Sequence, residues 1–223
     1  MRIKIPNDFI LVLNINIMTL KNVKISLNKI AKSLEELQDD REFLLKNSRE
    51  IIVLCSRSII ATHKGDLKIG KKNAQQAEVL LKKYRKKLNV NLKRYLVTPE
   101  QEFVEAISLI AIAEKKEIPS SQKLAVMSES YVLGLLDCIG ELKRMVFDKL
   151  RNNEIEESVR IFNIMENLYL QLYTFSMYDK VVKEARRKID VNRILVEDVR
   201  SAITEEKRRS EMIETLQSLG KGF

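Results

Sequence analysis

Apolar residues recur at helical spacing along almost the whole chain. Between residues 20 and 63 they fall three and four positions apart, as at Val23 and Leu27, which is the spacing of one face of an α-helix. Gly65 follows this stretch and predicts its C-terminal end. Further helices are predicted over residues 66–92, 98–117, 120–151, 154–175 and 179–219. The pattern therefore predicts an all-α protein, a bundle of mostly long antiparallel helices.

Local signals mark where the later helices begin and end. Thr98 is the predicted N-cap of one helix, because Pro99 suits the first helical turn and Gln101 can complete a capping box. Residues 119–121, Pro-Ser-Ser, predict the start of the next helix, and Asn152–Asn153 predict its end. The sequence thus predicts a series of helices joined by short turns.

The N-terminal segment does not continue this pattern. Residues 9–17 are apolar but are interrupted by Asn14 and Asn16, and they alternate as a strand does. The stretch is too short to span a bilayer, which takes about 20 apolar residues, and it lacks the cleavage site of a secretory signal. We therefore expect a poorly ordered or loosely docked extension over residues 1–17, one helical domain over 18–223, and no membrane partner.

The two cysteines, Cys55 and Cys138, lie in apolar helical surroundings, which is typical of reduced core residues. Because disulfides are rare in reducing compartments, this usage predicts a cytoplasmic protein. His63 is the single histidine, which excludes zinc sites made of several histidines. The sequence also contains no glycine-rich phosphate-binding loop.

The charge of the chain favours an anionic partner. Its formal net charge is +9, and residues 82–94 contain seven basic residues and no acid. Nucleic acid is the partner such a basic segment suggests, although a lysine-rich solvated helix face has the same composition. The residues predicted to bind nucleic acid here are Lys86, Lys87, Lys93 and Arg94.

Four carboxylates stand at two helical spacings. Glu102 and Glu105 are three positions apart, and Asp137 and Glu141 are four apart, so each pair lies on one helical face. Their apolar neighbours predict that these faces turn inward, where unpaired carboxylates are costly. A divalent cation would relieve the repulsion, because oxygen ligands suit Mg²⁺ or Mn²⁺. Ordinary solvated helix faces carry the same spacing, so spacing alone leaves both interpretations open.

Two acidic motifs resemble those of the translin/Trax family. The motifs are Gln-Glu-Phe-Val-Glu-Ala at residues 101–106 and Tyr-Val-Leu-Gly-Leu-Leu-Asp-Cys-Ile-Gly-Glu-Leu-Lys-Arg-Met at residues 131–145. A weaker likeness extends over roughly residues 20–210. The two motifs resemble most the Trax branch, and the short chain looks like an archaeal homologue.

The resemblance implies a fold, an assembly and an activity. The family has about seven helices and forms hollow octamers that bind single-stranded nucleic acid, and its Trax branch is a Mg²⁺-dependent endoribonuclease. Glu102, Glu105 and Asp137 match the catalytic, metal-binding carboxylates of that branch, and Glu141 matches the acid that follows them. Arg144 is a candidate for contact with a phosphate, or alternatively an ion-pair partner of Glu141.

We therefore expect a Mg²⁺- or Mn²⁺-dependent endonuclease that cleaves single-stranded RNA within a homo-oligomer, by the resemblance an octamer. Single-stranded DNA is a further candidate ligand. Two alternatives remain: a non-catalytic translin-like protein that binds RNA or DNA, and a helical scaffold whose acids serve assembly.

Overall fold

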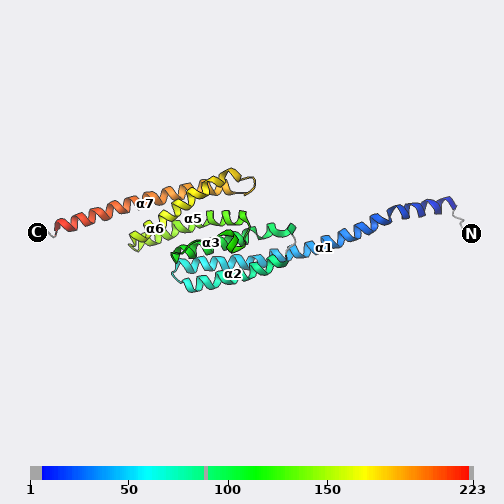
Figure 1. The fold of residues 1–223 in the computed structure, drawn as a ribbon, viewed down its shortest axis with the longest axis horizontal. Helices are drawn as coiled ribbons and strands as arrows, with labels where there is room; N and C mark the ends of the chain where they lie inside the picture. Colours follow the sequence, from blue (N-terminus) through cyan, green and yellow to red (C-terminus); the bar gives the residue numbers. More distant parts are fainter. Residues whose placement is uncertain (1–6, 88–89, 221–223) are drawn as a thin grey trace, which may run out of the picture. The chain divides into compact units, whose positions relative to one another are not determined.

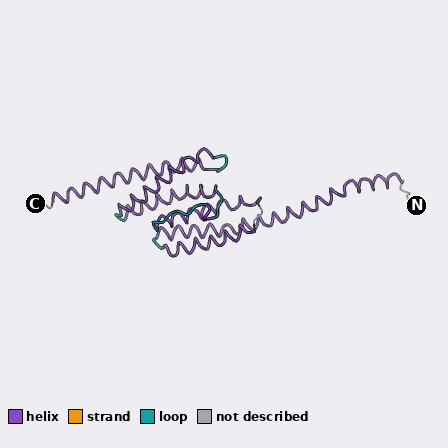
Figure 2. The backbone as a smooth tube through the Cα atoms, in the orientation of Figure 1, coloured by secondary structure: helices purple, strands orange, loops and turns teal. Residues whose placement is uncertain are grey.

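A computed structural model describes the backbone of residues 7–87 and 90–220, and the side chains of residues 20–86 and 92–218. These residues form helices joined by turns, and none of them forms a strand (Figures 1 and 2). The α-helices are α1 (Asn7–His63), α2 (Leu67–Lys87), α3 (Val97–Ala113), α4 (Ser121–Leu124), α5 (Ser128–Arg151), α6 (Ile155–Tyr173) and α7 (Ala185–Gly220). Two 3₁₀ helices, η1 (Val90–Leu96) and η2 (Thr174–Tyr178), join some of them. The predicted all-α class with about seven helices is confirmed.

The chain divides between Lys46 and Asn47 into two units. The first unit contains the N-terminal part of α1, and the second contains the rest of α1 with all the other helices. Residues 7–17 belong to α1, so the predicted strand-like character of this segment is wrong. A short apolar run does not separate strand from helix by its periodicity alone. Residues 1–6 lie outside the described residues, and the predicted domain boundary after residue 17 stays a prediction.

Helix α5 is the central element of the second unit. It packs against α3, α6 and α7, while α2 packs against α3 and α6 against α7 (Figure 1). Leu136, Ile139 and Leu142 on α5 are completely or almost completely buried, because they recur at three-residue intervals on one helical face. Among the described residues, no helix is both long and apolar enough to cross a membrane.

Two predicted helix starts differ from the structure. Helix α3 begins at Val97, directly after η1, and no side chain caps it, so Thr98 is not its N-cap. The helix predicted over residues 120–151 is two helices, because the chain turns at Ala125, whose φ is +52°. Ser120 caps the short α4 by accepting a hydrogen bond from the Lys123 N–H, and α5 begins at Ser128.

The predicted helix ends are closer to the structure. Gly65 follows α1 with φ of +79°, and Asn153 follows α5 with φ of +61°. Glycine and asparagine adopt this left-handed conformation at low cost, which explains why both residues end helices. Helix α3, in contrast, ends at Ala113 rather than near residue 117.

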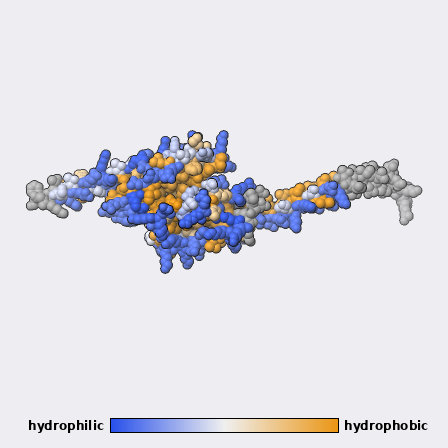
Figure 3. Space-filling view, in the orientation of Figure 1, coloured by the Kyte–Doolittle hydropathy of each residue, from blue (hydrophilic) through white to orange (hydrophobic). Residues whose placement is uncertain are grey.

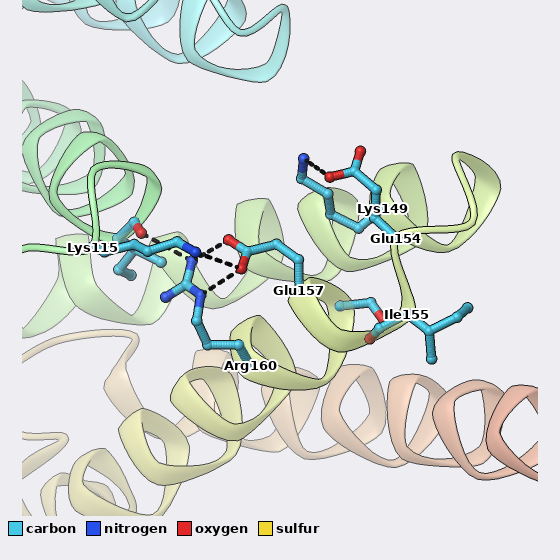
Figure 4. Close-up of polar contacts among 8 residues, drawn as sticks. Lys115, Lys149, Glu154, Ile155, Glu157 and Arg160 are labelled. Carbon is cyan, nitrogen blue, oxygen red and sulfur yellow. Dashed lines mark hydrogen bonds and ion pairs between the residues drawn. The ribbon is translucent and has the colours of Figure 1, made fainter.

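A polar cluster holds the end of α3 against α6 (Figure 4). Arg160 on α6 donates hydrogen bonds to Glu157 (2.7 Å) and to the Ile112 carbonyl oxygen (3.2 Å). Lys115 Nζ lies 3.1 Å from Glu157 Oε2. The hydrogen bonds from Arg160, supported by Lys115, lower the pKa of Glu157 to about 2. The cluster therefore fixes the helix that carries two of the predicted acids.

Candidate active site between helices α3 and α5

Helices α3 and α5 approach each other closely at Gly134. A Cβ atom at this position would lie 2.5 Å from the Gln101 carbonyl oxygen and 2.7 Å from Val104 Cβ. No side chain larger than hydrogen fits there without a shift of α3. Glycine at this position lets α5 pack directly against the backbone of α3. At Gly140, six residues further along α5, an added Cβ would meet nothing within 4 Å.

This approach brings the four predicted acids into mutual electrostatic contact. Glu105 is 8% exposed, and Glu102 is half-buried. Burial, followed by repulsion from Asp137, Glu102 and Glu141, raises the pKa of Glu105 to about 8. Burial and then Asp137 also raise the pKa of Glu102. Neither glutamate side chain makes a hydrogen bond or ion pair with another described residue.

Asp137 has a partner on each of its carboxylate oxygens. Gln101 donates a hydrogen bond from its side-chain amide to one oxygen, and Lys188 on α7 donates to the other. Lys188 belongs to the basic run at residues 183–188. Its charge partly offsets the repulsion that raises the pKa of Glu102 and Glu105. The site therefore contains three acids close together and one internal cation.

The fourth acid, Glu141, is held by a histidine. His63 Nε2, at the end of α1, lies 2.5 Å from Glu141 Oε2, and the His63 side chain is 4% exposed. This hydrogen bond lowers the pKa of Glu141 despite its partial burial. Arg144 is exposed, and its Nη1 lies 4.0 Å from the same Glu141 oxygen. Glu141, like Asp137, thus has side-chain partners, whereas Glu102 and Glu105 have none among the described residues.

The donor chemistry of the site fits a hard divalent cation. Glu102 and Glu105 offer carboxylate oxygens that no described group satisfies, and Asp137 offers a third carboxylate. In the present arrangement, no three acidic, histidine or cysteine side chains of the described residues are close enough together to hold a metal ion. Holding one ion with three carboxylates would therefore require other rotamers of Glu102 and Glu105, whose side chains have several rotatable bonds. Mg²⁺ also takes only one or two protein carboxylates and keeps several waters.

The structure describes the side chains of three of the four basic residues predicted to bind nucleic acid within residues 82–94, and all three are exposed. Lys86 at the end of α2 and Lys93 in η1 are exposed. Arg94 is exposed and lies over the ring of Tyr95, 5.0 Å from its centroid. The side chain of Lys87 lies outside the described residues. Lys86, Lys93 and Arg94 make no ion pair with any other described side chain.

Comparison with known families decides the classification. The model of the translin family matches residues 33–203, which include all four acids and all of α1 after Lys46. The chain belongs to the translin family.

Relatives of this translin-family chain agree with that match. An uncharacterized protein of Methanocaldococcus jannaschii is 40% identical over 177 residues, which cover 77% of this chain and 78% of that protein. AfC3PO is 30% identical in sequence, and its crystal structure matches with a TM-score of 0.74. The match covers 82% of this chain and 97% of AfC3PO. The structure of AfC3PO in complex with duplex RNA gives a TM-score of 0.73 at the same identity and coverage. Apo-NeC3PO shares the fold, at 24% identity and a TM-score of 0.67. The match covers 80% of this chain and 95% of the apo-NeC3PO chain.

Sequence reasoning missed a buried ion pair beside the site of this translin-family protein. Glu100 is 2% exposed, accepts a hydrogen bond from Arg85 Nε (2.8 Å) and accepts another from the Met127 N–H (2.8 Å). It therefore joins α2, the start of α3 and the start of α5. In the sequence, Glu100 looks like an ordinary acid in the first turn of a helix, so no signal could have separated it from a solvated one.

The environment of Glu105 predicts a pH effect on stability. Its pKa is about 8 in the fold against an ordinary value of 4.5, so its contribution to stability is complete below pH 4.5 and is lost as the pH rises through 8. Between pH 5 and pH 9, the free energy of unfolding of the metal-free protein should fall by on the order of 2–4 kcal/mol. The Glu105→Gln variant should not show this fall. Urea unfolding in EDTA at the two pH values measures this difference. Glu117→Gln changes an exposed acid and should show the same pH dependence of unfolding as the parent. If Glu105→Gln also shows the parental pH dependence, the surroundings of Glu105 do not disfavour its charged form.

Proposed function

We propose that this translin-family protein is a Mg²⁺-dependent endonuclease that cleaves single-stranded RNA. The observation that carries the proposal is the pair Glu102 and Glu105. Both carboxylates have a raised pKa, to which Asp137 contributes by repulsion, and neither has a described hydrogen-bonding partner. An unpaired, partly buried acid cluster costs stability, and acids with such shifted pKa values are typical of functional sites.

Each residue of the site has a role in this proposal. Glu102, Glu105 and Asp137 would hold the cation, which when bound lowers the pKa of a water and neutralises charge on the phosphate. Gln101 and Lys188 orient Asp137 through their hydrogen bonds. Hydrolysis adds this water to the phosphorus and leaves a phosphate monoester and a free hydroxyl. Because the Glu105 carboxyl is protonated at neutral pH, cation binding must displace its proton, so affinity should rise with pH.

Glu141 and Arg144 are assigned to the edge of the site. His63 holds Glu141 in one orientation through its hydrogen bond, so Glu141 would contribute one fixed carboxylate at the edge of the site. The exposed Arg144 guanidinium is suited to a phosphate oxygen of the RNA.

The comparisons support nucleic acid as the ligand and self-association as the working state. One structural relative, at 30% identity, was determined with duplex RNA, and the net charge of +9 suits a polyanion. We propose single-stranded RNA as the substrate, single-stranded DNA as a further ligand, and a homo-oligomer, by family likeness an octamer, as the assembly.

Lys188 favours a second candidate function. Its ammonium already neutralises Asp137, so the same arrangement also suits a non-catalytic RNA-binding protein in which Lys188 takes the place of a cation. Incubation of an end-labelled single-stranded RNA with the protein, in Mg²⁺ or in EDTA, separates the two functions. Cleavage in Mg²⁺ alone is the expected result; retention of intact RNA in both conditions would leave the binding function instead.

The basic surface predicts how RNA binding depends on salt. Replacing Lys86, Lys93 and Arg94 together with glutamine should weaken binding and reduce the slope of log affinity against log salt by up to about 2, at about 0.7 for each lost phosphate contact. Fluorescence anisotropy with a labelled RNA at several salt concentrations measures the slope. Replacing the exposed Lys64, Lys68 and Lys72 removes the same charge from another surface and should change the slope less. Equal slopes in the two triple variants would assign Lys86, Lys93 and Arg94 to a general solvated face.

A further inference from the structure

The N-terminal unit presents an apolar stripe that nothing within the unit covers. Leu20, Leu27 and Leu34 are each 58% exposed, Val23 is 47% exposed and Ile30 is 52% exposed. We call these five residues the α1 seam. Figure 3 shows hydrophobic residues along one side of this described segment and hydrophilic residues along the other. The unit consists of a single described helix, so it has no second element of its own to pack on the seam.

The spacing of the α1 seam is that of a coiled coil. The intervals between its residues are three, four, three and four, which is a heptad repeat with Leu20, Leu27 and Leu34 at a and Val23 and Ile30 at d. Leu37 continues the repeat at d, and Arg41 falls at the next a position. Most of the seam precedes residue 33, where the match to the translin family begins. The repeat therefore crosses the start of the matched region, because Leu34 and Leu37 lie inside it.

Charge along the same segment is divided into two halves of opposite sign. Residues 20–32 contain four lysines and no acid, a net charge of +4. Residues 35–42 contain five acids against the single Arg41, a net charge of −4. A second copy of the helix lying parallel would bring like charges together, whereas an antiparallel copy would bring each basic half against an acidic half.

We propose that residues 23–41 of α1 form an antiparallel coiled coil with the same segment of a second copy of this chain. One register satisfies both the charges and the apolar repeat. It pairs Val23 with the partner's Arg41, Leu27 with the partner's Leu37, and Ile30 with the partner's Leu34. Each pair joins an a position to a d position, and all three are centred on residue 32. The proposed contact ends at Arg41, the last position of this register.

The acidic half argues against other occupants of the seam. A lysine-rich amphipathic helix alone would suit an anionic membrane or an RNA, but residues 35–42 would repel both. A long unsupported helix is also marginal in water, because most helical stability comes from packing of the apolar face. A second copy supplies apolar surface and complementary charge together.

Disulfide trapping tests the register in the full-length protein. Val23→Cys and Arg41→Cys are made separately, since native Cys55 and Cys138 are fully buried and will not compete. The proposal expects little cross-linking of either variant alone, because in an antiparallel pair the two copies of residue 23 lie about 27 Å apart and a disulfide requires Cα atoms within about 7 Å. A mixture of the two variants should form a disulfide dimer at least tenfold faster. Cross-linking of Val23→Cys alone would indicate a parallel pair, and no cross-linking in any sample would mean that a second copy does not cover the seam; both results overturn the proposal.

A matched pair of substitutions tests whether the seam itself drives the contact. Leu27→Asp in both cysteine variants should reduce the yield of the mixed disulfide at least tenfold. Ile25→Asp places the same charge two residues away, at an exposed apolar position off the seam, and should leave the yield within about twofold of the parent. Equal losses for the two substitutions would show that charge on the helix, not the seam, determines the result. This proposal does not depend on RNA cleavage, so its failure leaves the proposed function standing.

Discussion

Replacing Glu105 with glutamine should reduce Mg²⁺-dependent RNA cleavage by roughly 100-fold or more. The amide keeps the size of the side chain but cannot supply the charge that holds a cation. Glu102→Gln and Asp137→Asn should have similar effects, because the three carboxylates are electrostatically coupled to one another. Initial rates on an end-labelled single-stranded RNA measure the loss.

Two accompanying results distinguish loss of the site from loss of the fold. RNA affinity in EDTA should stay within a few-fold of the parent, because the exposed basic residues supply most of the attraction. The metal-free variants should be as stable as the parent or more stable, because repulsion among the acids is reduced. Glu117→Gln removes an exposed acid and should cleave normally. If all three site variants cleave RNA at the parental rate, the acids belong to packing or assembly.

Replacing Gly134 with alanine should destabilise the protein by about 1–3 kcal/mol. Its Cβ would overlap the Gln101 carbonyl oxygen and Val104 on α3, so the two helices that carry the acids must separate. Cleavage should fall as well, because Gln101 orients Asp137 across this crossing. Urea unfolding of the metal-free protein measures the change in stability.

Gly140 provides the control on the same helix. A Cβ there meets nothing within 4 Å, so Gly140→Ala should stabilise α5 by up to about 1 kcal/mol through its higher helix propensity. Opposite signs for the two glycines are the expected result. A neutral or stabilising Gly134→Ala would mean that α3 and α5 do not approach as closely as the structure describes.

The local features of this protein could be predicted from its sequence, because helical spacing relates residues within a few turns. The periodicity of residues 131–145 predicted a buried face on α5, and the spacing of Glu102 with Glu105 predicted that they share a face. The turns at Gly65 and Asn153 were predicted by residues that tolerate positive φ.

The contacts between helices could not be predicted in this way. His63 and Glu141 are 78 positions apart, and Lys188 and Asp137 are 51 apart, so no spacing rule connects them. His63 lies at the end of α1, and its side chain is buried against Glu141 of α5. The start of α3 was misjudged because η1 leads directly into it, which removes the need for the N-cap that Thr98 and Pro99 indicated.

The most direct test of the acidic site is calorimetric titration of the metal-free protein with Mn²⁺ at pH 8, without RNA. Mn²⁺ has the same preference for oxygen ligands as Mg²⁺, and the test needs no catalytic turnover. We predict saturable binding of Mn²⁺ to each chain that is lost or weakened at least tenfold in Glu105→Gln and Asp137→Asn but kept in Glu117→Gln. Equal Mn²⁺ binding by the parent and all three variants would contradict a cation site between α3 and α5.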